Sequence, residues 1–198
     1  MDAVPALLQE ISGRLERGET DAAGFLDAFC RFLADQIGCA RAGVWAFTTT
    51  DHGRVLRCLA MYDRRSDTIV GATDMDPAEV GVYFEHLLRD GVIVADDAAT
   101  HPATVGFADD YLVPNDVRSI LDACFTVNGR LIGAFACEHT GMAMYWSPRQ
   151  VRRLRAIAAR ASLVLLKAAR SPRDTAPAAL SGSGALPHWL RDALAATR

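Results

Sequence analysis

The spacing of the hydrophobic residues changes twice along this chain, and no other feature of the sequence constrains its fold as much. Up to Gly38 the apolar residues recur every three or four positions, which is the period of an amphipathic helix. From Arg41 they form short continuous or alternating runs typical of β-strands, and after Ser147 the helical period returns. Helices at both ends, with strands between them, predict an α+β fold.

Two helices are expected before the first strand. Residues 1–19 carry one amphipathic stripe, which Gly18 interrupts. Asp21 can cap a second helix, and Gly38 stands where a helix C-cap favours glycine. We expect the apolar face of this second helix to cover a sheet.

The middle of the chain carries strand and turn signals. The apolar runs at 44–47 and 55–62 flank a polar turn and predict an antiparallel hairpin. Asn128-Gly129, between two strand-like runs, is the strongest hairpin signal in the chain. The other expected elements are a helix that begins at Pro77, a short strand at 92–94 and a loop-rich segment at 98–118.

A long helix and a tail are expected after the strands. Ser147, Pro148 and Gln150 form a capping box with proline at the first helical position, so a helix begins there and runs to about Ala169. Residues 170–186 have the Ser, Pro, Ala and Gly content of a flexible linker, and residues 187–198 can form a short amphipathic helix. The expected organisation is an N-terminal helix at 1–19, a domain at 20–169, a linker at 170–186 and a terminal helix at 187–198.

Composition and charge argue against several classes of function. The 198 residues carry a formal net charge of -3, which provides no basic field for nucleic acid. The sequence begins without the pattern of a secretory signal and contains no apolar run long enough to cross a membrane, so we expect a cytoplasmic protein. The 5 cysteines occur singly, which favours reduced thiols in a core over disulfides or a zinc site.

Several short motifs resemble those of the GAF domain over about residues 20–169, in particular the GAF modules that often precede diguanylate cyclase or kinase domains. They are residues 92–98, His101-Pro102, 111–114, 119–123, Gly133, 137–139, Gly141 and Trp146. The chain departs from that group at Met144 and Arg149, where an arginine and an acidic residue are common. The resemblance implies a central antiparallel sheet of five to six strands. It places the N- and C-terminal helices on one face and a pocket, roofed by loops and a helix, on the other.

The residues expected to bind a ligand come from the segments that would surround this pocket. Asp122 lies between apolar neighbours on a predicted strand, so it faces either solvent or the pocket, where a ligand or Arg118 would have to pair it. The aromatic residues of the predicted roof can equally belong to the hydrophobic core rather than contact a ligand. An aspartate such as Asp97 often stabilises a turn rather than binding a ligand. The candidates are Tyr83, Phe84, Asp97, Phe107, Tyr111, Ser119, Asp122 and Cys124.

Metal and thiol chemistry have weaker support. Asp96, Asp97 and His101 lack the number and spacing of ligands that make a metal site convincing. A few GAF proteins reduce methionine sulfoxide with pocket cysteines, and Cys124 and Cys137 are the thiols to test for such an activity. Bilin-binding members attach their chromophore beside a histidine, and here a glutamate separates Cys137 from His139.

The terminal helices predict a homodimer. Residues 1–38 carry 7 acidic side chains against 3 arginines, whereas residues 149–170 carry 7 basic side chains and no acidic one. Opposite charges on helices with apolar stripes favour a bundle over binding to a membrane surface. The expected interface residues are Leu8, Ile11, Leu15, Leu154, Ala158 and Leu165.

The sequence thus predicts a non-enzymatic sensory or regulatory domain that binds a small molecule of unidentified chemistry, with no identified cofactor. Because residues 170–198 are too few for an output domain, we expect the signal to reach a separate partner protein through the packing of the terminal helices. The alternatives are an interaction or scaffold module without a ligand, and a cysteine-dependent methionine sulfoxide reductase.

Overall fold

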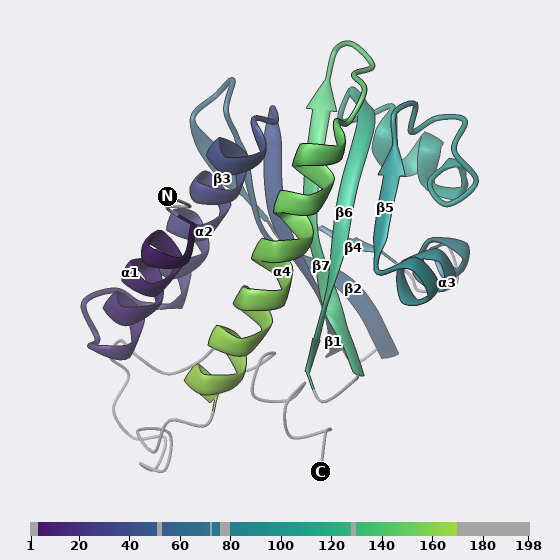
Figure 1. The fold of residues 1–198 in the computed structure, drawn as a ribbon. Coiled ribbons are helices and arrows are strands. Elements are labelled where there is room, and N and C mark those ends of the chain that lie inside the picture. The colour runs from purple at the N-terminus through teal and green to yellow at the C-terminus, as the bar shows by residue number, and fades with distance from the viewer. Residues whose placement is uncertain (1–3, 51–52, 72, 76–79, 128–129, 170–198) are drawn as a thin grey trace.

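A computed structural model describes residues 4–50, 53–71, 73–75, 80–127 and 130–169, and it has the predicted α+β architecture. All strand pairs are antiparallel, and the sheet order is β3-β2-β1-β7-β6-β5, with β4 also paired to β2 (Figure 1). The strands are β1 (Arg41–Thr50), β2 (Gly53–Asp63), β3 (Thr68–Val70), β4 (Asp74–Met75), β5 (Val92–Ala95), β6 (Val117–Val127) and β7 (Arg130–Thr140). The prediction of five to six strands did not include the very short β3 and β4.

The central pairing of β1 with β7 joins the two halves of the chain. Arg41 lies opposite Glu138 in this register, and Ala46 lies opposite Gly133. Gly133 is required for close approach, because an added Cβ there would lie 1.9 Å from the carbonyl oxygen of Trp45. Two long strands from the two halves of the chain therefore meet at the centre of the sheet, and their backbones approach closely at Gly133.

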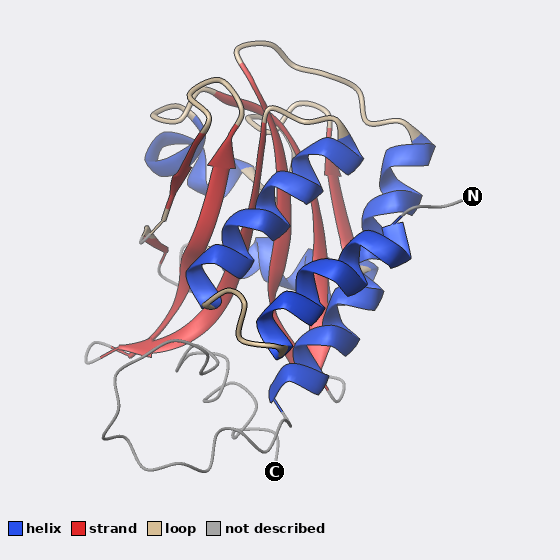
Figure 2. Cartoon of the chain, turned by 90° about the vertical axis from the view of Figure 1, so that its left-hand side faces the viewer, coloured by secondary structure: helices blue, strands red, loops and turns tan. Residues whose placement is uncertain are grey.

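Three helices cover one face of the sheet (Figure 2). They are α1 (Val4–Glu16), α2 (Ala22–Ile37) and α4 (Pro148–Ala169). The predicted caps are confirmed, since Asp21 accepts the N–H of Gly24 at 2.8 Å and Gly38 has a φ of 74°. The capping box also forms, because Ser147 Oγ accepts the N–H of Gln150 at 3.3 Å.

The core beneath these helices corrects the predicted dimer contacts. Leu8, Leu154 and Ala158 are buried within a single chain, so their side chains are not available to a second copy in this arrangement. Ile11 and Leu15 are partly buried against the same core. The apolar stripes of α1 and α4 are thus largely used to hold the helices on the sheet. The homodimer itself remains a prediction.

Smaller elements cover the other face of the sheet. They are α3 (Gly81–Asp90), a 3₁₀ turn η1 (Val105–Phe107) and a short π-helical turn η2 (Ala108–Leu112). A second buried cluster lies between them and the sheet, with Trp45, Tyr83, Phe107 and Tyr111 among its members. The segment expected as loop therefore contains two helical turns, whose lengths are too short to produce a hydrophobic period.

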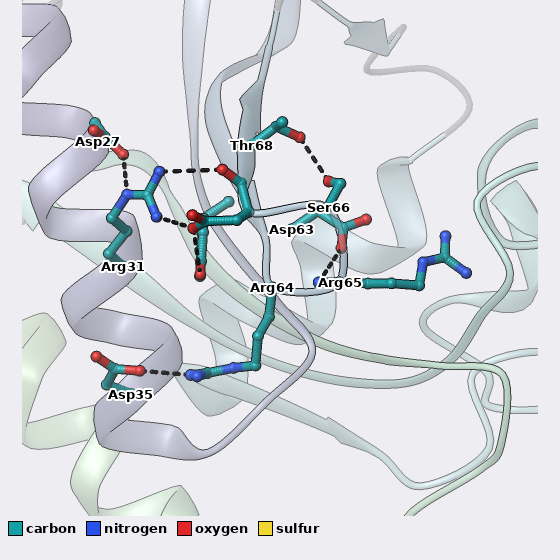
Figure 3. A network of polar contacts seen from close by, with 10 residues as sticks. Asp27, Arg31, Asp35, Asp63, Arg64, Arg65, Ser66 and Thr68 are labelled. Atoms are coloured by element: carbon teal, nitrogen blue, oxygen red, sulfur yellow. Dashed lines mark hydrogen bonds and ion pairs between the residues drawn. The ribbon is translucent and has the colours of Figure 1, made fainter.

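A polar network fixes α2 to the turn between β2 and β3 (Figure 3). Arg31 forms ion pairs with Asp27 and Asp67, and its guanidinium lies 4.5 Å from the ring centroid of Tyr62. Arg64 pairs with Asp35 of α2 at 2.6 Å. Exposed pairs of this kind contribute about 0.2–1 kcal/mol each, so the network orients the turn more than it stabilises the fold.

Several predicted features lie outside the described residues. These are Pro77, the Asn128-Gly129 turn, the linker at 170–186, the helix at 187–198 and the side chain of Leu165. Among the described helices, none combines the length and apolar character needed to span a membrane.

Candidate functional site

A small cavity lies between the sheet and the elements that cover its second face. Its volume is about 20 Å³, enough for one water molecule. Aromatic and aliphatic side chains dominate its lining, and two acidic side chains interrupt it. The lining residues are Trp45, Leu56, Met75, Val80, Tyr83, Phe107, Tyr111, Ile120, Asp122, Ala136 and Glu138.

Asp122 is the first of the two acids. Its neighbours Leu121 and Ala123 face the terminal helices, so strand alternation directs Asp122 to the cavity face. Its Oδ2 accepts the hydroxyl of Tyr83 at 2.7 Å, and its Oδ1 accepts the N–H of Cys137 at 3.3 Å. Burial raises the pKa of Asp122 to about 8, so this carboxyl holds a proton more strongly than an exposed one.

The pairing of Asp122 with Arg118, which the sequence left open, is wrong. Arg118 donates instead to Asp116, the residue before β6, with an N···O distance of 2.9 Å. The tyrosine of α3 takes the place that was expected for arginine or ligand. The carboxyl is therefore satisfied by a hydroxyl donor that carries no charge.

Glu138 is the second acid, and it belongs to a buried triad. Its Oε1 accepts the hydroxyl of Tyr111 at 2.6 Å, and its Oε2 lies 3.3 Å from Nη1 of Arg41. Glu138 is only 1% exposed and Arg41 only 6% exposed. Burial raises the pKa of Glu138, although Arg41 and the Tyr111 hydroxyl oppose this change.

The triad contains two polar atoms without a hydrogen-bond partner in the described structure. They are Nε of Arg41 and Oε2 of Glu138, whose 3.3 Å contact with the guanidinium is an ion pair without hydrogen-bond geometry. Unsatisfied buried polar atoms are costly, so they are uncommon outside functional sites. Glu138 lines the cavity, and Arg41 contacts Glu138 without being part of the lining.

The structure brings together four of the eight predicted ligand residues: Tyr83, Phe107, Tyr111 and Asp122 line the cavity. Phe84 is adjacent but packs on Phe47, with ring centroids 4.6 Å apart. The other seven of the eleven lining residues were not predicted. Glu138 carries the same signal as Asp122, an acid within an apolar strand. Trp45, which lines the cavity, and Arg41, which contacts Glu138 without lining it, have no local signal, because the pairing of β1 with β7 brings them there.

The other three predicted residues have different roles. Asp97 is exposed, and its carboxylate accepts the N–H of Ala99 at 3.1 Å, a hydrogen bond by which aspartates stabilise turns. Ser119 is fully buried and connects two loops, because its Oγ donates to the carbonyl of Asp96 and accepts the N–H of Met144, both at 2.7 Å. Cys124 is half-buried and lines a separate groove beside α4.

No cysteine is among the described residues that line the cavity. Cys137 is buried on the opposite face of the sheet, in the core beneath the terminal helices, where burial raises its pKa. His139 stacks on Trp146 with ring centroids 4.6 Å apart. The pairing of Cys137 with His139 that was considered for chromophore attachment therefore does not occur at this cavity.

The residues considered for metal binding serve the loops. Asp96 accepts the N–H of Trp146 at 2.8 Å, and His101 Nδ1 accepts the N–H of Ala103 at 3.1 Å. In the part of the chain that the structure describes, no group of three or more His, Cys, Asp or Glu side chains is arranged to hold a metal ion.

Comparison with known proteins gives one family and a consistent fold. The sequence model of the GAF domain matches residues 21–165. No protein with a curated description matches the chain in sequence. Three solved structures of similar fold are each under 25% identical to this chain, so the similarity concerns the fold alone.

The phycoerythrobilin-bound GAF domain of a cyanobacterial phytochrome has a TM-score of 0.64 and 14% identity, covering 83% of this chain and 95% of that one. The GAF domain of Acinetobacter phosphoenolpyruvate-protein phosphotransferase has a TM-score of 0.58 and 14% identity, covering 85% and 96%. The blue-light absorbing form of the Thermosynechococcus elongatus PixJ GAF domain has a TM-score of 0.55 and 20% identity, covering 72% and 83%.

Proposed function

Because this chain belongs to the GAF domain family, we propose that it is a non-enzymatic sensory domain that binds a small molecule at the cavity between β6, β7 and α3. Three lines of support are the two acidic side chains in its apolar lining, its connection to α4 and the phycoerythrobilin-bound neighbour of the same fold. The absence of cysteines from the described cavity lining favours binding over thiol chemistry.

The observation that carries the proposal is the pair of buried acid–tyrosine contacts in an otherwise apolar cavity. Burying two carboxyl groups costs free energy that well-packed hydrophobic residues would avoid, so their presence is better explained by recognition than by stability. Asp122 and Glu138 offer acceptors within the lining. These acids favour a polar ligand that presents N–H or O–H donors.

Ligand entry requires the roof to move, because a cavity of about 20 Å³ has no space for an organic molecule. The roof helix α3 connects the cavity to α4. Tyr83 in its first turn bonds Asp122, and the carbonyl of Asp90 at its end accepts Nη2 of Arg155 at 3.2 Å. A ligand that displaces Tyr83 would thereby move the end of α3 that Arg155 of α4 contacts, and the signal would be the shift between two arrangements.

Native mass spectrometry of the purified protein, followed by denaturing analysis of whatever dissociates, tests the proposal. We expect the protein to retain a small molecule, and Ala136→Leu to lose it because the new side chain fills the cavity. Val105→Leu is the matched control, since it adds a methylene group at an exposed position. Retention of the same molecule by Ala136→Leu would contradict binding at this cavity.

A protein-interaction module without a ligand is the second candidate. The small volume of the cavity favours it, because the tyrosine hydroxyls already satisfy one oxygen of each acid. In that case the purified protein would carry no bound molecule, and Ala136→Leu would change stability alone.

A further inference from the structure

A second hollow in the surface lies on the opposite side of the sheet, where α4 passes the end of β6. It has a volume of about 460 Å³, within the range of about 300–1,000 Å³ typical of ligand sites. Its lining residues are Gly91, Ala123, Cys124, Thr126, Arg155, Ala158, Ala159 and Ser162. We infer that this groove is the docking site for the C-terminal segment of the same chain, residues 187–198.

The groove exists because its lining side chains are small and because one strand is shorter than its neighbour. The first residue of β5, Val92, pairs with Ala123 of β6. Further along β6, one more hydrogen bond joins the two segments, from the N–H of Cys124 to the carbonyl of Gly91. Beyond this point β6 has no strand partner on that side among the described residues. Small side chains on both walls leave space that a large apolar side chain can fill.

The terminal segment supplies side chains of the required kind. Trp189, Leu190, Ala193 and Leu194 recur at helical spacing and make one apolar face. Such a short helix is not stable alone in water, so its apolar face requires a surface to cover. Asp192 lies between these residues, and the groove presents the exposed cation Arg155.

The connecting chain is long enough to reach the groove. Ser162 precedes the end of α4 by 7 residues, a distance of about 10 Å along the helix axis. The linker at 170–186, with its Ser, Pro, Ala and Gly content, has a root-mean-square span of about 23 Å. Tethering at such a length gives an effective concentration in the millimolar range, so even weak contacts would keep the segment docked. These observations favour the segment of the same chain over a second copy.

Cys124 provides a direct reporter of docking. It is half-buried in the groove, whereas the other four cysteines are buried. The rate at which an uncharged disulfide reagent modifies Cys124 should be low in the full chain. Trp189→Ala, or truncation after residue 186, should raise it roughly tenfold, the factor that corresponds to about 1.4 kcal/mol of docking free energy. His188→Ala, on the side of the helix opposite the apolar face, is the matched control, and Cys124→Ser gives the background from the buried thiols.

Equal rates in the full chain and in both tail variants would overturn the inference. A modification rate of Cys124 that rises when the protein is diluted would overturn the inference as well. Such a result would mean that a second copy of the chain covers the groove. A further test is independent of Cys124 protection. In the Ala193→Cys variant, which keeps Trp189, a disulfide between residues 193 and 124 should form within one chain under mild oxidation, and failure to form it would count against docking at this groove.

Discussion

At the scale of single residues, the two buried acids of the cavity differ in their environments. Glu138 lies beside the guanidinium of Arg41, which favours its charged form, whereas Asp122 meets only a tyrosine hydroxyl and a backbone N–H. Burial therefore has the larger effect on Asp122, whose pKa is raised to about 8. Near neutral pH Asp122 therefore keeps its proton, whereas at Glu138 the guanidinium of Arg41 opposes the upward shift of the pKa that burial causes.

The raised pKa of Asp122 predicts how stability depends on pH. Between about pH 4 and pH 8 the folded protein keeps a proton that the unfolded chain releases, so the free energy of unfolding falls as the pH rises through this window. We expect Asp122→Asn, which keeps an acceptor for Tyr83, to remove a slope of up to about 1.4 kcal/mol per pH unit. Urea denaturation from pH 4.5 to 8.5 measures it, and wild-type and variant curves that run parallel would contradict the assignment.

At the scale of elements, buried polar side chains position the loops around the site. Ser119 of β6 and Asp96 after β5 together hold the loop that leads into α4, through the N–H groups of Met144 and Trp146. The start of α4 is also tied to the end of α2, because Nε2 of Gln150 donates to the carbonyl of Ile37 at 3.0 Å. The position of the long helix is therefore fixed by hydrogen bonds at its beginning as well as by its apolar face.

Ser119→Ala should be strongly destabilising for its size. It removes two hydrogen bonds and leaves the N–H of Met144 without its bond to Ser119, at a cost of about 1–3 kcal/mol in the free energy of unfolding. Ser162→Ala is the matched control, since its hydroxyl bonds only the Ala158 carbonyl within α4, and it should cost less than about 0.5 kcal/mol. Chemical denaturation distinguishes the two, and equal effects would show that Ser119 has no special role.

At the scale of the whole molecule, the sequence predicted what depends on local signals. The caps at Asp21 and Gly38, the capping box at Ser147 and the strand hairpins all follow from nearby residues. It did not predict β3 and β4, which have 3 and 2 residues and no period to detect. The sequence predicted site residues of β6 but none of β1. The contact of Arg41 with Glu138 depends on the register of β1 and β7, which are far apart in the sequence.

The predicted homodimer also belongs to this scale. Because Leu8, Leu154 and Ala158 are buried in the core of one chain, a dimer through the terminal helices would use exposed residues such as Leu7 of α1. We expect Leu7→Glu to weaken dimerisation by about tenfold or more in the dissociation constant, and Val82→Glu, at an exposed position of α3, to leave it unchanged. Sedimentation velocity measures both, and a wild-type monomer at all concentrations would refute the dimer.

The attachment of α4 at its beginning has a geometric consequence. Arg155, which contacts the end of α3, lies 7 residues after Pro148, or about 10 Å along the axis of α4. Ala169 lies 21 residues after Pro148, or about 31 Å along the same axis. If the helix pivots at its attached end, it acts as a lever arm. A small displacement imposed by α3 at Arg155 would then be magnified about threefold at Ala169.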